Sequence, residues 1–328
     1  MQTKIEKLPK ATIKIEVTVP AEKVQEERKK TLNDLAKTTE IKGFRKGNAP
    51  VDLVEKSLNP TEINTKVIQS LVEKYYVEAL KENKISPISN PKIEITAFGE
   101  HQDFVFVATV AVRPDVKLGD YRKSIKTKAD QKKQDAKKQK ETALKEGKSL
   151  ENIHDHLHTH EIIDEIANSA ELEIPEILIE EEVDRYMARL VDQMQSLDMK
   201  MEQYLRAQNK TAEQVRGEFT EMAERNLRAE FALAEAIKAE KIEVTDAEIE
   251  ETAKASGDPQ ALENIKDPST KYYVKSILEK NKLLTSIMEE LGDLVADHSE
   301  ENENKEKKES LEKKPTKESK KDKKEENK

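Results

Sequence analysis

Apolar and polar side chains follow two different periods in the first third of the chain. Residues 13–19 alternate strictly, which predicts a half-buried strand, and Pro20 then opens a charged helical stretch, as proline does in a first helical turn. Residues 61–81 instead repeat an apolar side chain at every fourth position, which predicts a helix with one buried face. The expected order is a strand at 13–19, helices at 20–37, 51–57 and 61–81, and strands at about 92–98 and 103–112.

The second half of the chain is predicted to be helical, because its apolar positions recur at spacings of three and four. Thr211 with Gln214, and Thr245 with Glu248, have the spacing of capping boxes and mark the starts of two helices. Helices are therefore expected to begin near Pro175, Met201, Thr211, Thr245 and Ser269, and the last, at about 269–296, is expected to bury Tyr273 and Ile277 on its apolar stripe.

Charge is segregated along the chain although the net charge is only −9. Residues 122–148 carry eleven Lys and Arg against four Asp and Glu, with no aromatic side chain to stack on bases, so this segment is interpreted as a solvated helical linker. Contact with RNA phosphates is its alternative role. Residues 299–328 hold eleven Lys and ten acids with a single Leu, too few apolar groups to offset the entropy of ordering, and are predicted to be disordered.

Composition narrows the classes of protein further. The 328 residues are 38% charged, 35% hydrophobic and 4% aromatic, a balance that favours thin cores over a single large one. The absence of cysteine excludes disulfides and thiolate chemistry. The N-terminal residues lack the apolar core of a signal peptide, and no apolar run approaches membrane-spanning length. The sequence therefore predicts a cytoplasmic protein without a membrane partner.

The most informative short segment is the loop Gly43-Phe44-Arg45-Lys46-Gly47-Asn48-Ala49-Pro50. Glycines frame an aromatic and two cations, and Pro50 fixes the backbone where the next helix begins. Such a loop presents an exposed Phe beside positive charge, which suits docking onto an anionic, grooved partner.

With the flanking elements, this loop resembles the ribosome-binding domain of trigger factor, the ribosome-associated bacterial chaperone. The family signature is Gly-Phe-Arg-x-Gly-Lys-x-Pro, and this chain departs from it at Asn48, where the family has lysine. The resemblance implies docking at the tunnel exit of the large ribosomal subunit, on rRNA and protein. The residues that it implies for ribosome binding are Gly43, Phe44, Arg45, Lys46 and Gly47.

The later segment Glu173-Ile174-Pro175-Glu176, followed by 179–185, resembles the C-terminal domain of the same family, whose helical arms form a cradle for nascent chains. The implied fold is an α+β ribosome-binding domain followed by an elongated all-α domain with helical arms and a disordered charged tail. The implied partners are nascent and unfolded polypeptides, and homodimer formation away from the ribosome stays open. Flexible thioethers suit varied clients, so the candidate client-binding residues are Met187, Met194, Met199, Met201 and Met222.

The resemblance leaves out the prolyl isomerase domain that trigger factors carry between these parts. About thirty residues separate the two matched regions, which is too few for a domain of this kind. The chain is therefore expected to be a shortened trigger factor that is not an enzyme and needs no cofactor. The expected domains are 1–118 for ribosome binding, 119–150 as a basic linker, 151–298 as the helical cradle and 299–328 as the tail.

The same residues leave three alternative function classes. These are a periplasmic chaperone with a helical cradle, a helical RNA-binding scaffold, and a prolyl isomerase in family name only. Four histidines alternate with other residues just before 161, and this segment is expected to be helical: His154, His156, His158 and His160. On a helix, 154/158 and 156/160 form two pairs on nearly opposite sides, so the sequence predicts no metal site shared by all four. His160 also starts a zincin-like pattern, but Asp164 stands where its second histidine is required.

Overall fold

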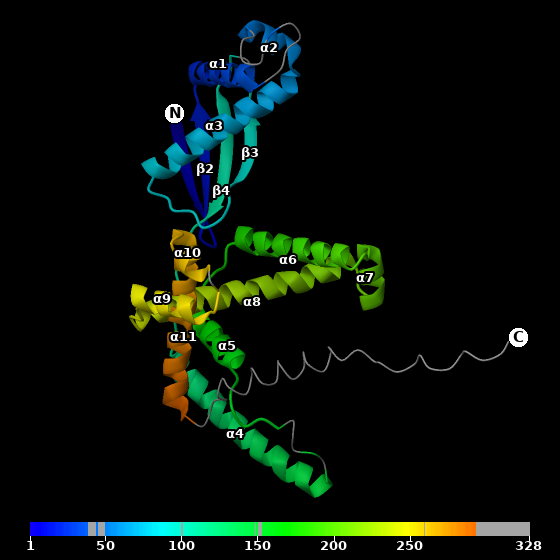
Figure 1. Cartoon of the computed structure of the whole chain (residues 1–328), viewed down its shortest axis with the longest axis vertical. Helices are drawn as coiled ribbons and strands as arrows, with labels where there is room; N and C mark the ends of the chain where they lie inside the picture. Colours follow the sequence, from blue (N-terminus) through cyan, green and yellow to red (C-terminus); the bar gives the residue numbers. More distant parts are fainter. Residues whose placement is uncertain are drawn as a thin grey trace, which may run out of the picture. The chain divides into compact units, whose positions relative to one another are not determined.

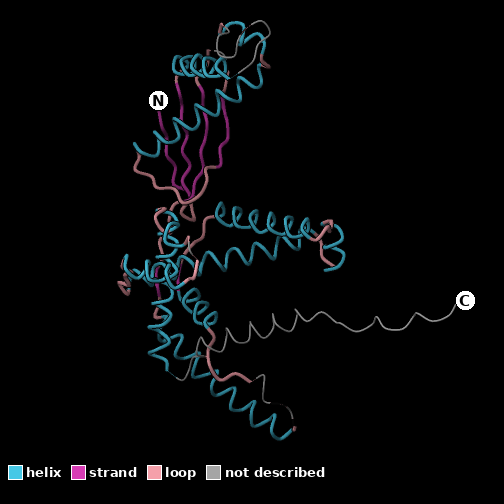
Figure 2. Tube along the Cα trace, in the orientation of Figure 1, coloured by secondary structure: helices cyan, strands magenta, loops and turns pink. Residues whose placement is uncertain are grey.

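The computed structural model describes residues 1–38, 44, 50–99, 101–147, 149, 153–258 and 260–292. Two compact units emerge from it. Unit 1 consists of Met1–Lys117 and Ala170–Phe231, and unit 2 consists of Leu118–Ser169 together with the residues that follow Phe231. An α+β N-terminal region followed by helices is the architecture that the sequence predicted, and Figures 1 and 2 show these elements.

A four-stranded antiparallel sheet forms the N-terminal part of unit 1, in the order β1-β2-β4-β3. The strands are β1 (Gln2–Leu8), β2 (Thr12–Val19), β3 (Lys92–Ala97) and β4 (Phe104–Ala111). In the central pair, Ile15 lies opposite Ala108 and Val17 opposite Phe106. All four of these side chains are buried, so the strict alternation in the sequence corresponds to one face of the sheet turned to the core.

Strand β1 was not predicted. Its side chains are mostly exposed because it is an edge strand, and only Ile5 and Leu8 are large apolar residues in it. Its place is set by backbone pairing with β2 across the turn at Lys10 and Ala11, both of which have positive φ. An edge strand of this kind carries no hydrophobic alternation, which is the signal that identified the other strands.

Three helices accompany the sheet: α1 (Ala21–Thr38), α2 (Val51–Ser57) and α3 (Pro60–Glu82). Figure 1 shows α3 lying across the strands. Its buried positions repeat every four residues, as the sequence predicted, and pack against the inward side chains of β2 and β4. The buried residues that α3 supplies to this core are Ile63, Val67, Leu71, Tyr75 and Ala79.

The remainder of unit 1 is a helical arm. Helices α6 (Glu176–Ser196) and α8 (Ala212–Ala239) run side by side, and α7 (Met201–Gln208) lies at their far end (Figure 1). A small core of Leu190, Met194 and Val215 joins them. The predicted capping box at the start of α8 is present, since the Thr211 N–H donates to Gln214 Oε1 at 2.8 Å and the Gln214 N–H donates to Thr211 Oγ1 at 3.2 Å.

Unit 2 contains α4 (Tyr121–Glu146), α5 (Thr159–Ser169), α9 (Asp246–Ala255), α10 (Ala261–Asn264) and α11 (Pro268–Leu291). The capping box of Thr245 and Glu248 at the start of α9 is confirmed. Two short strands, β5 (Lys117–Leu118) and β6 (Ala170–Glu171), form a separate two-stranded sheet. No described helix is both long enough and apolar enough to cross a membrane.

The helix expected in the range 119–150 is present, but it is not solvated on all sides. Most of this range is α4, which packs against α5 and buries one side of its surface. Three of the five buried side chains are alanines, so composition alone did not reveal the stripe: the buried residues are Tyr121, Ile125, Ala129, Ala136 and Ala143. The predicted domain ranges consequently differ from the two units, and the range 299–328 lies outside the described residues.

Glu27 is a charged residue buried in the N-terminal part of unit 1, with 4% of its surface exposed. Its carboxylate accepts hydrogen bonds from Ser70 Oγ at 2.8 Å and Lys74 Nζ at 3.2 Å, and so ties α1 to α3. Burial by itself would raise the pKa of this carboxyl. The hydrogen bonds from Ser70, Lys74 and Lys30 outweigh burial and hold the pKa below its usual value.

Replacing Glu27 by Gln should therefore destabilise the sheet domain by about 1–3 kcal/mol at pH 7, the range for a hydrogen bond to a buried charged group. The lowered pKa means that the wild-type advantage is complete above the unfolded value of about 4.3 and disappears as the pH falls through the folded value. Native-state hydrogen exchange of α1 and α3 amides at pH 7 and pH 3 measures this, with exposed Glu26→Gln as control. An equal destabilisation at both pH values would contradict the charged role of Glu27.

Candidate functional site

The predicted ribosome-binding loop is only partly within the described residues. Gly43, Arg45, Lys46 and Gly47 lie outside them, as does Asn48. Phe44 is described, and 40% of its surface is exposed. Before the loop, helix α1 ends at Thr38. After it, Pro50 is the N-cap residue of α2, with φ −57°.

Arg28 holds the helices on either side of this loop together, a role that the sequence did not indicate. Its guanidinium donates to Glu55 on α2 and to Asn64 on α3, each at 2.9 Å. Val54 of α2 is fully buried beside these contacts. A rigid guanidinium that bridges two helices fixes the points where the loop leaves and re-enters the domain. The signal in the sequence was weak, because an arginine on a charged helix face is normally solvated.

The five candidate methionines differ in their surroundings. Met194 is buried in the core of the arm, and Met187 and Met201 are half-buried against that core. Met199 and Met222 are exposed. Met199 and Met222 are thus accessible at the surface, whereas Met194 is engaged in packing α6 against α8.

Further apolar side chains are exposed on the helical elements. On the arm these are Val191 and Leu197, and on α10 and α11 of unit 2 they are Leu262, Tyr272, Tyr273 and Ile277. The expectation that Tyr273 and Ile277 are buried was wrong. Helix α11 buries Leu283, Leu284 and Ile287 in its C-terminal half, and its N-terminal half has no comparable buried residue among those described. Tyr272, 75% exposed, was missed because it lies off the apolar stripe.

Part of the basic surface of α4 is engaged in ion pairs within unit 2. Lys128 Nζ lies 2.6 Å from Glu165, and Lys132 forms an ion pair with Glu161. Arg122 pairs with both Glu240 and Glu290, and the first of these contacts, with Glu240, contributes most to raising the pKa of the guanidinium. The acids opposite these cations neutralise that part of the positive charge. Further lysines of α4 are exposed, among them Lys123, Lys126, Lys133, Lys137 and Lys145.

Tyr121, the aromatic residue nearest this basic segment, is also unavailable for stacking. It is buried, and its hydroxyl donates a hydrogen bond to Glu240. Burial and the adjacent Glu240 carboxylate raise the pKa of Tyr121 to about 12. The ring therefore serves packing in unit 2, and α4 does not combine cations with an exposed base-stacking ring.

The predicted helix over His154–His160 was wrong at its N-terminal end. Helix α5 begins at Thr159, and the described residues before it, from 153 to 158, form no helix. The chain bends at His156 instead of continuing a helix, and His154, His156 and His158 come together instead of facing opposite sides. These three are the group of described residues able to hold a metal ion.

Comparison with known proteins identifies the family. A family model described as bacterial trigger factor protein matches residues 1–146, and a model described as the trigger factor C-terminus matches residues 130–289. The chain belongs to the trigger factor family. The two matches overlap at 130–146, within α4, so the trigger factor regions adjoin each other and leave no room for a further domain between them.

Curated trigger factors match about a third of the chain. The trigger factor of Clostridium kluyveri (strain NBRC 12016) is 39% identical over 122 residues, and that of Clostridium botulinum (strain Hall) is 37% identical over 122 residues. Each match covers 37% of this chain and 28% of the relative, so the chain spans under a third of the length of the curated relatives it matches.

A solved structure shares the fold over most of the chain. Its title is "Promiscuous Substrate Recognition in Folding and Assembly Activities of the Trigger Factor Chaperone". The TM-score is 0.60 with 14% sequence identity, covering 89% of this chain and all of that one. At this identity the likeness supports the fold of the trigger factor, and the functional argument depends on this chain's own residues.

Proposed function

We propose that this trigger factor is an ATP-independent chaperone of the cytoplasm that docks beside the tunnel exit of the large ribosomal subunit and shields newly made polypeptides. The observation that carries the proposal is the exposed Phe44 within the Gly-Phe-Arg-Lys-Gly loop of a chain that belongs to this family. An aromatic side chain exposed between helices is unfavourable in water and gains free energy when a partner covers it.

In the proposed docking, Arg45 and Lys46 contact rRNA phosphates, Phe44 fills an apolar hollow, and Gly43 and Gly47 give the loop its shape. The frame for this loop is the bridge from Arg28 to Glu55 and Asn64. Because the frame is held by side chains of α1, α2 and α3, the loop is anchored to the sheet domain at both ends. Ordered anchors lower the entropy lost on docking.

Client binding is proposed on the exposed apolar residues of the helical elements. Met199, Met222 and Leu197 on the arm, and Tyr272 and Tyr273 on α11, offer apolar and aromatic area to an unfolded chain. Met187, Met194 and Met201 support the arm from inside and can contribute where a client loosens its packing. Separate small contacts of this kind favour promiscuous, reversible holding over tight binding of one partner.

RNA binding through α4 is the weaker alternative. Lys128, Lys132 and Arg122 are engaged with acids of unit 2, and Tyr121 is buried. Phosphate binding by these cations would require exchange of the existing ion pairs, which lowers the gain from counterion release.

Ribosome docking is tested by replacing Phe44, Arg45 and Lys46 together with Ala. Cosedimentation with ribosomes should be lost while helical circular dichroism is kept, because Phe44 is exposed and these residues lie between helices. The log of the wild-type affinity should fall with log salt by about 0.7–0.9 per phosphate contact. Exposed Lys4 and Lys7 on β1, replaced by Ala, form the charge control. Binding of the triple variant at wild-type level would exclude the loop as the docking site.

Client holding is tested with Leu197, Met199 and Met222 replaced by Ser in one variant and Tyr272 and Tyr273 in another. Each should weaken suppression of aggregation of an unfolded client, with or without ATP, because apolar area is worth about 25 cal/mol per Å² when a client buries it. Exposed Leu144 on α4, replaced by Ser, is the matched control and should leave suppression unchanged. Equal effects of the control and the arm variant would refute a localised client surface.

Isomerase activity is not expected from this chain. The trigger factor regions adjoin within α4, so no domain with an aromatic pocket for a twisted proline imide stands between them. A proline peptide assay should show no acceleration over the uncatalysed barrier of about 18–20 kcal/mol. A reproducible rate increase proportional to protein concentration, and resistant to repurification, would show that the expectation is wrong.

A further inference from the structure

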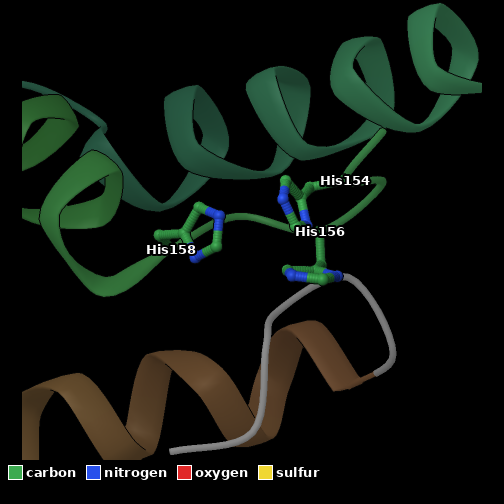
Figure 3. A group of neighbouring side chains, drawn as sticks. All are labelled: His154, His156 and His158. Carbon is green, nitrogen blue, oxygen red and sulfur yellow. The ribbon is translucent and has the colours of Figure 1, made fainter. Parts of the chain in front are cut away.

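Three histidines of unit 2 converge at the start of α5, outside every surface considered above. The ring centroids of His154, His156 and His158 are 5.6, 5.4 and 5.2 Å apart, which is nearly an equilateral triangle. Figure 3 shows the three side chains on the segment that leads into α5, beside α4. One ligand nitrogen from each ring lies within 4.8 Å of the others.

A bend in the backbone explains why these rings meet. A straight strand rises about 3.3 Å per residue and would hold residues four apart about 13 Å from each other. The chain instead bends at His156, which brings the side chains on either side of it together. Leu157, between two of the histidines, is fully buried and holds the bend against unit 2. His154 is exposed and His156 and His158 are half-buried, which leaves an ion a path of entry.

Two contacts anchor the backbone at the cluster. Asp155 Oδ2 accepts a hydrogen bond from Lys140 of α4 at 2.6 Å, which secures the segment between the first two histidines. The His158 N–H donates to Glu161 Oε2 at 2.9 Å, which fixes the third at the start of α5. The hydrogen bond from Lys140 holds the pKa of the Asp155 carboxyl below its usual value. The ligand set is thus built on a segment that is already in place.

We propose that His154, His156 and His158 form a binding site for a divalent transition-metal ion, with Zn²⁺ as the expected occupant and water in the fourth position. Imidazole suits Zn²⁺, Cu²⁺ and Ni²⁺, whereas Mg²⁺ and Ca²⁺ require oxygen ligands. Ligand nitrogens at about 2.0–2.1 Å from a tetrahedral Zn²⁺ stand roughly 3.3 Å apart. Side-chain rotations of the exposed and half-buried rings close the distance from the present geometry.

The surroundings are compatible with a dication. Lys140 is paired with Asp155, and Lys132 with Glu161, so the nearest cations of α4 are neutralised. Asp155 Oδ1 also lies 3.6 Å from Nδ1 of His156. A carboxylate beside a ligand imidazole raises its basicity and orients its ring.

His160 stands apart from the ligand group. Its ring stacks on that of His158, with centroids 5.6 Å apart and an interplanar angle of 10°. Its backbone is in α5, and its nitrogens are not among the group that meets within 4.8 Å. This gives the proposal a sharp control, because a generic helical pair of histidines would use His160 together with His156. The site is independent of ribosome docking and client holding, and bound metal would fasten the segment before α5.

The test is titration of the untagged, chelator-treated full chain with ZnCl₂ in a calorimeter. One Zn²⁺ per chain is expected, with no response to Mg²⁺. His154→Gln and His156→Gln should each weaken binding by at least about tenfold, because losing a ligand costs no less than the 10–100-fold typical of outer-shell changes. His160→Gln and the distant His101→Gln should bind like wild type. Hydrogen exchange at 153–162 should slow on addition of Zn²⁺ in wild type only.

Two results would overturn the site. Absence of Zn²⁺ binding, or unchanged binding in both His154→Gln and His156→Gln, would show that the three rings are not ligands. Loss of binding in His160→Gln equal to that in His156→Gln would replace the three-ligand site by a helical pair. His154 is exposed, so its variant should keep the wild-type circular dichroism and remains informative if the variant of the half-buried His156 misfolds.

Discussion

The small supply of apolar side chains is the constraint on which the rest of this structure depends. The chain is 38% charged and 35% hydrophobic, so each element can bury only a narrow stripe. In the sheet domain the stripe is filled by large residues such as Phe104, Phe106 and Leu71, which make a compact core. In unit 2 the buried positions of α4 are mostly alanines, which bring helices close but remove little apolar area from water. Other helices of unit 2 do bury large side chains, among them Ile162, Ile166 and Leu283, so the narrow contact belongs to α4 and not to the whole unit.

Ion pairs specify how α4 aligns with its neighbours, which its narrow apolar contacts do not. Along α4, Lys128, Lys132 and Lys140 meet Glu165, Glu161 and Asp155, in the reverse order along the chain. That reversal fixes an antiparallel register between α4 and the segment that contains α5. Each partly exposed pair is worth at most about 1 kcal/mol, so their role is to exclude shifted registers more than to supply stability. The same pairs place acids opposite part of a strongly basic helix, within a protein of negative net charge.

Periodicity predicted the elements whose faces differ in burial, and it failed where they do not. Strand β2 and helix α3 have one buried face each, so their periods of two and four were legible in the sequence. The capping boxes at Thr211 and Thr245 were equally local and are present. Edge strand β1 has no buried face, and its pairing with β2 uses backbone groups that are the same for every residue type.

The remaining errors have a shared cause, which is that a sequence does not show what lies opposite a face. Tyr273 follows the stripe of α11, yet the core of unit 2 ends before it, so the ring is exposed. The histidines at 154–158 were assigned the helical period, but the chain before α5 is not helical: it bends at His156, and the buried Leu157 anchors it. Arg28 gave no signal, because its importance arises only when Glu55 and Asn64 are brought to it by the fold.

Charged side chains border the exposed aromatic residues of α11. Tyr272 and Tyr273 are flanked in sequence by Lys271 and Lys275, and these lysines pair with Asp246 and Glu279. An apolar side chain bordered by solvated ion pairs can contact a flexible, unfolded chain, whereas a second folded copy would have to desolvate those charges to reach it. Dispersed aromatic and thioether groups within a charged surface therefore favour weak contacts with extended polypeptides over self-association, which is the balance that a holding chaperone requires.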